Sequence, residues 1–223
     1  YQLKNNLANI SYKNPNVMDF SVFKQCIDKI PKNVLISFGG YSDICLHPEA
    51  TKMILYAFDS GHKVSIFSTL VGMELEDIDN IKHIPFVNFH VHLPDSSNYA
   101  KIPVNKKYLA VLKKLQKSNL NKLTCMSMGD LHPKVKDILQ IDHADEKMIS
   151  RAGNLSNVKN GFDKKLGPLS CNISSHDGFE DRFDSNTLLP NGDVTLCAMD
   201  YGLTCVIGNL TNMDYNSLFT NNE

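Results

Sequence analysis

The chain has 223 residues, of which 42% are hydrophobic and 21% charged, and its formal net charge is −1. This is an ordinary globular composition, so it excludes fibrous and disordered proteins, and its even charge balance gives no indication of nucleic-acid binding. No apolar run reaches the roughly 18 to 20 residues of a membrane span. The six cysteines are too few for a disulfide scaffold and the N-terminal residues lack a signal-peptide pattern, so we expect a cytoplasmic protein.

Helix-like and strand-like segments alternate between residues 19 and 140. Helices are expected where apolar residues recur every three or four positions, and strands where short apolar runs end in glycine or polar residues. The expected helices are 19–30, which Asp19 caps, 49–60, 75–84, 106–117 and 133–140, and the expected strands are 34–38, 63–70, 86–93 and 123–128. This order is typical of right-handed βαβ units around a parallel sheet.

The alternation is lost after residue 141. Residues 141–223 contain short strands and turn residues, and we place His143 and Asp145 there in a loop. The clearest feature is a predicted hairpin at 187–197, which turns at Pro-Asn-Gly-Asp. Half of the cysteines lie in this small second module: Cys171, Cys197 and Cys205. An iron–sulfur cluster takes about four thiolates, so the count falls one short and spacing alone does not establish a metal site.

Polar residues and glycines follow the predicted strands. Gly39, Gly40 and Asp43 come after the first strand, and Ser68 and Thr69 end the second. Ligands of parallel α/β folds bind at the carboxyl ends of the strands, so these residues are candidates for binding a polar cofactor. The alternative is that loops between strands and helices are polar simply because they are exposed.

Two histidines on the third strand are further candidates. His90 and His92 lie two residues apart on a strand and therefore project to the same face, where they could act as ligands or proton carriers. The alternative is that neighbouring groups satisfy them at the margin of the core.

Two long segments resemble radical S-adenosylmethionine (SAM) enzymes. Residues 34–70, VLISFGGYSDICLHPEATKMILYAFDSGHKVSIFSTL, resemble the region just downstream of their cluster-binding cysteines. Residues 188–210, LLPNGDVTLCAMDYGLTCVIGNL, resemble their C-terminal SPASM-type extension, which carries an auxiliary iron–sulfur cluster. The resemblance extends from about residue 18 to 219. It implies an incomplete parallel (β/α)6 TIM-like barrel over residues 1–150 and a SPASM-like module over residues 151–223.

The resemblance also implies roles for particular residues. Gly39, Gly40 and Asp43 match the glycine-glycine-glutamate loop that receives the methionine amino group of SAM, with Asp43 in place of Glu and shifted by two residues. Ser68 and Thr69 match the strand end that reaches the ribose or carboxylate of SAM. Cys171 and Cys197 match the first ligands of the auxiliary [4Fe–4S] cluster. No catalytic residue is assigned.

The implied reaction is radical chemistry. A reduced [4Fe–4S] cluster cleaves SAM to a 5′-deoxyadenosyl radical, which abstracts a hydrogen atom from a peptide or sugar-type substrate, and flavodoxin or ferredoxin supplies the electron. The CxxxCxxC loop that holds this cluster in the family is absent from the chain, and we expect it upstream of Tyr1.

Two alternatives remain at this point. One is a cluster-free, inactive binding module on the same fold. The other is an ordinary α/β-barrel enzyme that uses His92, Asp95 and Asp130 as acid and base.

Overall fold

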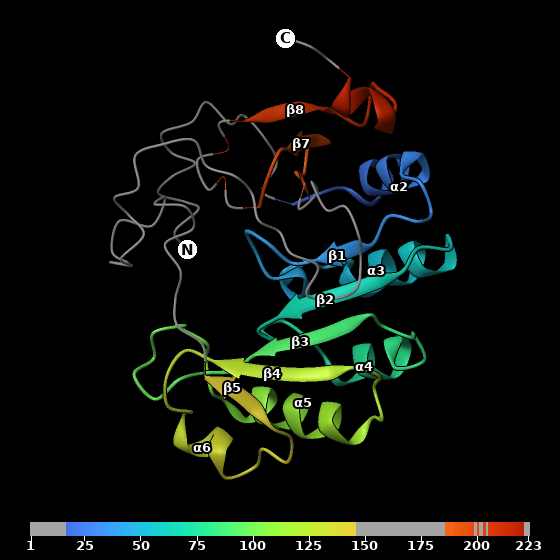
Figure 1. Cartoon of the computed structure of the whole chain (residues 1–223). Coiled ribbons are helices and arrows are strands. Elements are labelled where there is room, and N and C mark those ends of the chain that lie inside the picture. Colours follow the sequence, from blue (N-terminus) through green and yellow to red (C-terminus); the bar gives the residue numbers. More distant parts are fainter. Residues whose placement is uncertain (1–16, 146–185, 199, 201–202, 204, 221–223) are drawn as a thin grey trace, which may run out of the picture. The chain divides into compact units, whose positions relative to one another are not determined.

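A computed structural model describes residues 17–145, 186–198, 200, 203 and 205–220 of the chain. They belong to two compact units, Phe23–Lys147 and the combination of Tyr1–Val22 with Met148–Glu223 (Figure 1). The predicted domain boundary at residues 150 and 151 lies outside the described residues, as does Cys171. None of the described helices is both long enough and apolar enough to cross a membrane.

The first unit contains a five-stranded parallel sheet whose strand order follows the sequence. The strands are β1 (Ile36–Phe38), β2 (Val64–Ser68), β3 (Asn88–His92), β4 (Leu123–Ser127) and β5 (His143–Asp145). The helices are α2 (Phe20–Lys29), α3 (Ala50–Asp59), α4 (Leu75–Ile81), α5 (Lys106–Lys117) and α6 (Pro133–Lys136). The predicted parallel α/β architecture is therefore confirmed for this unit.

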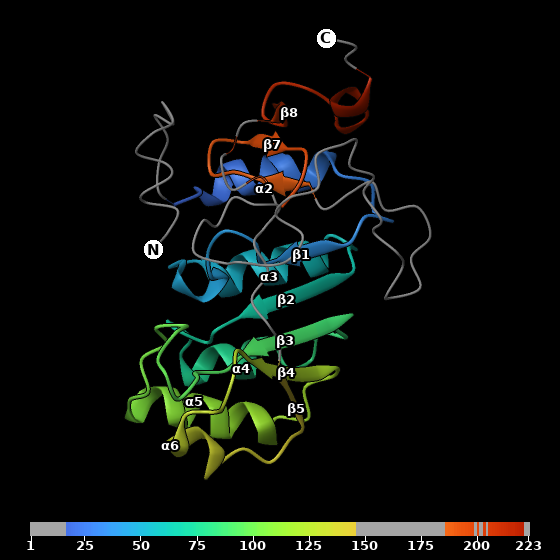
Figure 2. The ribbon, with the colours of Figure 1, turned by 60° about the vertical axis from the view of Figure 1, so that its left-hand side comes forward.

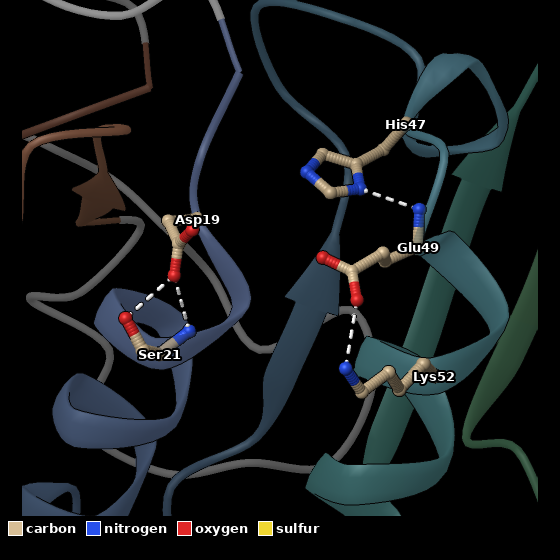
Figure 3. A network of polar contacts seen from close by, with 5 residues as sticks. All are labelled: Asp19, Ser21, His47, Glu49 and Lys52. Atoms are coloured by element: carbon tan, nitrogen blue, oxygen red, sulfur yellow. Dashed lines mark hydrogen bonds and ion pairs between the residues drawn. The ribbon is translucent and has the colours of Figure 1, made fainter.

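Short polar contacts fix where the helices begin. Before α2, the Asp19 carboxylate accepts hydrogen bonds from the Ser21 amide at 2.7 Å and the Ser21 hydroxyl at 2.5 Å, which confirms Asp19 as a cap (Figure 3). Before α3, His47 Nδ1 accepts from the Glu49 amide at 3.0 Å, and Glu49 pairs with Lys52 at 2.7 Å (Figure 3). The Asn105 side chain caps α5 by accepting from the Tyr108 amide at 2.9 Å.

The connecting helices lie on one face of the sheet. Parallel strands in sequential order, joined by right-handed crossovers, place every connecting helix on the same side. Figures 1 and 2 show α3, α4 and α5 along one side of β1–β4. The strand residues that pack beneath them are at most 3% exposed: Ile66, Phe89, Val91 and Cys125. The unit is therefore a partial, open TIM-like layer, and its second face carries polar and aromatic residues.

Two local predictions were wrong. His143 and Asp145 belong to β5, which pairs with β4 through Cys125↔His143, and the Asp145 carboxylate accepts from the Gly129 amide at 2.8 Å. Helix α6 ends at Lys136 instead of continuing to residue 140. The Gln116 side chain accounts for this early end, because its oxygen accepts from the Gln140 amide at 2.6 Å and holds that backbone outside the helix.

The second unit contains a three-stranded antiparallel sheet and a short 3₁₀ helix. Its strands are β6 (Thr187–Leu188), β7 (Asp193–Thr195) and β8 (Val206–Asn209), and the 3₁₀ helix is Tyr215–Phe219. The predicted hairpin at 187–197 is confirmed, and its turn uses Gly192 at φ +88°. The Asn209 side chain joins β8 to this turn by donating to the Asp193 carboxylate at 2.8 Å.

Candidate functional site

The candidate site lies where β1 and β2 end side by side. Parallel pairing aligns Phe38 with Ile66, so the residues that follow each strand emerge at the same edge of the sheet. The chain leaves β1 through Gly39 and Gly40 and enters a 3₁₀ turn, Ile44–Leu46, which Asp43 caps. Gly40 has φ +107°, a left-handed conformation that favours glycine.

Asp43 joins the two strand ends. Its Oδ1 accepts from the Cys45 amide and the Ser68 hydroxyl, each at 2.9 Å. Its Oδ2 accepts from the Thr69 amide at 2.5 Å and from the Thr69 hydroxyl. A carboxylate offers about four lone-pair sites, and four donors fill them here. The structure therefore brings Asp43, Ser68 and Thr69 together, and Asp43 holds the loop after β1 against the end of β2.

The hydroxyl of Ser68 extends this network inward. Its single hydrogen goes to Asp43, so its oxygen accepts from the Leu70 amide at 2.8 Å and from the Cys45 thiol at 3.1 Å. Burial, together with the negative charge of Asp43, raises the pKa of the Cys45 thiol to about 12. The thiol is therefore protonated at neutral pH, and Cys45 acts as a buried donor rather than as a nucleophile.

Two glycines allow close backbone approaches around this network. A Cβ atom on Gly39 would lie 3.0 Å from the Cβ of Phe67 on β2. A Cβ atom on Gly72 would lie 2.2 Å from the carbonyl oxygen of Cys45, and Gly72 also has φ +95°. The loop after β2 therefore rests directly on the 3₁₀ turn that Asp43 caps.

We expect Gly72→Ala to destabilise the first unit more than Gly61→Ala does. Gly61 has φ +91° but nothing within 4 Å of the added carbon, so it isolates the conformational cost of about 1–2 kcal/mol. Gly72→Ala adds a collision with the Cys45 backbone, which raises the loss by about a further 1–3 kcal/mol. Urea unfolding monitored by circular dichroism measures both values. Equal losses for the two variants would contradict the close packing of this loop.

Asp95, one of the candidate acid–base residues, holds the loop after β3 in place. It is 2% exposed and accepts from the Ser97 hydroxyl at 2.6 Å, the Tyr99 amide at 2.7 Å and the Ala100 amide at 2.8 Å. Burial raises its pKa, but these donors outweigh burial and leave the pKa below its ordinary value. Asp95 therefore stays ionised as an acceptor for its own loop, and the acid–base alternative is not favoured.

His90 lies on the face of the sheet that the connecting helices leave uncovered, and His92, two residues along β3, projects to the same face, as the sequence predicts. The Nδ1 atom of His90 is 2.8 Å from the Thr124 hydroxyl, and the ring of His90 lies 5.4 Å from the ring of Phe67. Phe67 is 46% exposed although it sits in the middle of the sheet. The sequence does not single out Phe67, because β2 resembles a strand buried on both faces, and nothing in the residues of β4 indicates the contact between Thr124 and His90.

The described cysteines fall into two groups. Cys26, Cys45 and Cys125 are buried in the first unit, so the prediction that Cys26 is a core residue is confirmed. In the second unit Cys197 is half-buried and Cys205 is exposed. The backbone turns at Asp200, whose carboxylate accepts from the Cys205 amide at 2.8 Å, and the Cys205 carbonyl accepts from the Leu196 amide. The described residues contain no group of three or more His, Cys, Asp or Glu side chains suited to a metal.

The sheet, its one-sided helices and the polar strand ends define a partial α/β barrel, and comparison with solved structures gives the same class. The chain is similar in fold to BtrN, a radical SAM enzyme. Against the crystal structure of BtrN in complex with AdoMet and 2-DOIA, the TM-score is 0.62 at 16% identity, over 94% of this chain and 72% of that chain. Against selenomethionine BtrN in an open conformation, the TM-score is 0.52 at 13% identity, over 92% of this chain and 69% of that chain.

No family model matches the chain, and no curated protein matches it. At identities this low, the likeness to BtrN is a likeness of fold. The chain therefore shares the α/β fold of BtrN.

Proposed function

We propose that the chain belongs to a radical SAM enzyme and that SAM binds at the joined ends of β1 and β2. The main support for the proposal is the junction at Asp43, whose carboxylate accepts hydrogen bonds from Ser68 and Thr69 and so holds the loop that begins with Gly39 and Gly40. The same residues stand where the sequence resembles the SAM-binding loop of the family. The fold is shared with BtrN, whose crystal structure contains AdoMet, the same molecule as SAM.

The electrostatics of the junction suit a cationic ligand. All four donors to Asp43 are neutral groups, and within the described residues Asp43 forms no ion pair. Asp43 therefore adds a negative charge at the strand ends that no cationic side chain among the described residues pairs with. SAM carries a sulfonium and an ammonium group, and both are attracted to such a charge.

The backbone of the first loop suits close contact with a ligand. Gly39 is half-buried and Gly40 is exposed, and neither carries a side chain that would keep a ligand from the main chain. In this proposal the backbone of Gly39 and Gly40 meets the amino acid end of SAM. Ser68 and Thr69 shape the adjoining wall, and Asp43 supplies the charge and holds the loop.

The auxiliary cluster is proposed at Cys171 and Cys197, with Cys205 as a further ligand. Thiolates are the ligands that iron–sulfur clusters take, and the turn at Asp200 returns the chain so that Cys205 pairs beside Leu196, next to Cys197. The cluster would supply electron transfer or substrate anchoring. The SPASM-like assignment of residues 151–223, the cytoplasmic location and the flavodoxin or ferredoxin electron donor belong to the same proposal.

Formation of 5′-deoxyadenosine tests the reaction. The full-length protein is reconstituted anaerobically with iron and sulfide, reduced with dithionite and given SAM. We expect 5′-deoxyadenosine to accumulate with reductant and not without it. SAM binding without 5′-deoxyadenosine in a protein that takes up no iron would instead establish the inactive binding module.

A further inference from the structure

A buried histidine joins two segments at the amino ends of β1 and β2, at the edge of the sheet opposite the candidate site. His62 lies in the turn between α3 and β2 and is only 3% exposed. Its Nε2 lies 3.1 Å from Nζ of Lys32, and its Nδ1 lies 3.3 Å from the carbonyl oxygen of Val34. Lys32 and Val34 belong to the connection between α2 and β1. These two hydrogen bonds, which we call the His62 contact, therefore hold that connection against the turn before β2.

The partner atoms fix the protonation state of His62. The ammonium group of Lys32 can only donate hydrogen bonds, so Nε2 must accept from it with its lone pair. The single proton of the neutral ring then lies on Nδ1, which donates to the Val34 carbonyl oxygen. A second proton on Nε2 would remove the acceptor and set two positive charges against each other. The His62 contact therefore requires a neutral imidazole.

The carboxylates near His62 do not compensate a positive charge on its ring. Asp28 on α2 is close enough to act on His62, but its carboxylate already accepts a hydrogen bond from the Tyr56 hydroxyl. The neighbours of His62 along the chain, Asp59 and Lys63, are exposed. Among the described residues, no carboxylate forms an ion pair with His62.

The balance of these groups favours the neutral ring. Burial lowers the pKa of His62, and the positive charge of Lys32 lowers it further. The carbonyl groups of Val34 and Ile27 and the charge of Asp28 act in the opposite direction but are outweighed. The unfolded chain therefore takes up a proton at this residue near the ordinary pKa of 6.5, before the folded protein does. Stability from the His62 contact is present above that pH and is lost as the pH falls.

We propose that the His62 contact is an acid-sensitive switch built into the fold. Neutral His62 holds the connection between α2 and β1 in place. When a proton from the solvent adds to Nε2, the hydrogen bond from Lys32 breaks, the exposed Lys32 side chain turns into water, and the connection is released. The inference does not depend on the SAM site, because the contact lies at the opposite ends of the strands.

Titration of His62 tests the first step directly. Imidazole signals of the full-length protein are recorded by NMR without SAM from about pH 8 to about pH 5, and His62→Gln identifies the His62 signal. We expect His62 to titrate below pH 6.5. Lys32→Met removes the adjacent positive charge and should move the midpoint of the His62 titration upward.

The same proton should appear in the stability of the protein. Between about pH 7.5 and pH 5.5, we expect the unfolding equilibrium constant of wild type to rise about threefold more than that of His62→Gln. Glutamine offers one acceptor and one donor in place of the imidazole but takes up no proton. His83→Gln is the matched control, because His83 is an exposed histidine in the corresponding turn after α4, and it should keep the wild-type pH dependence. Urea unfolding at each pH gives the three values.

Amide exchange locates the release. The Val34 amide donates to the Pro31 carbonyl oxygen and the Ile36 amide to that of Lys63, each at 3.0 Å. After correction for the intrinsic effect of pH, both amides should lose protection in acid while those of α5 keep it. A His62 that titrates at or above pH 6.5 in the folded protein, or equal pH dependence in wild type and His62→Gln, would overturn the inference. Should His62→Gln fail to fold, the titrations of wild type and Lys32→Met still decide.

Discussion

Asp43→Ala is expected to weaken SAM binding at least about tenfold and to destabilise the first unit by about 2–4 kcal/mol. The substitution removes the acceptor of four hydrogen bonds and leaves the amides of Cys45 and Thr69 without their partner. Each buried donor left unsatisfied costs about 1–3 kcal/mol. The loss of affinity follows from the released loop and from the missing negative charge, and a factor of ten corresponds to about 1.4 kcal/mol.

Asp43→Asn separates the effect of the negative charge of Asp43 from the effect of its side-chain shape. An amide keeps one oxygen for the Cys45 amide and the Ser68 hydroxyl but presents an NH₂ group to the two donors of Thr69. We therefore expect a loss of stability about half that of Asp43→Ala, together with weaker SAM binding. Asp79→Asn is the control, because Asp79 is an exposed carboxylate on α4 that pairs with Lys82 and Lys114. Urea unfolding and calorimetry with SAM measure both effects, and unchanged SAM affinity in Asp43→Ala would place the SAM site elsewhere.

Cys197→Ala or Cys171→Ala is expected to remove about four irons per chain, the content of one [4Fe–4S] cluster. The second unit has few buried apolar side chains in its described part: Leu189, Val194, Leu203, Leu210 and Leu218. Three short strands with so small a core need another source of stability, and a bound cluster supplies one because binding to the folded form adds to the free energy of folding. The second unit of either variant should therefore also become sensitive to protease.

Cys26→Ala is the control for iron content. Cys26 is fully buried on α2, so its substitution leaves a small cavity and should not alter the iron bound. Iron and sulfide are assayed after anaerobic reconstitution of the full-length protein. Equal iron in wild type, Cys171→Ala and Cys197→Ala would establish that the two residues are ordinary thiols in a cluster-free module.

The main elements of the first unit could be predicted because their patterns are strong. Helix α5 is confirmed with its predicted bounds, since Tyr108, Val111, Leu112 and Leu115 form one buried face. Strand β5 was missed because all three of its residues are exposed and none is a β-branched or aromatic residue. Its formation depends on pairing with β4 at the edge of the sheet, which no local pattern in His-Ala-Asp indicates.

The position of the candidate site could be predicted from the sequence, but the contacts within it could not be predicted. Parallel strands put Asp43, Ser68 and Thr69 at one edge of the sheet, and that much follows from the strand order. The Asp43 carboxylate accepts four hydrogen bonds from this chain because of the path of the loop after β1, which has two extra residues, Tyr41 and Ser42. No pattern in the sequence gives that path. Likewise, the apolar sequence of β2 does not indicate that the Phe67 side chain is exposed. Phe67 is exposed because all the connecting helices lie on the opposite face of the sheet.

Amide hydrogen exchange with and without SAM tests the central claim, that SAM binds at the joined ends of β1 and β2. With saturating SAM we expect slower exchange in residues 39–46 and 68–72, which form the junction around Asp43. Exchange in residues 113–117 and 137–140, which line a cavity of about 340 Å³ between α5 and the segment after α6, should stay unchanged. Protection confined to these residues, or no protection of residues 39–46 at saturating SAM, would contradict this location of the site.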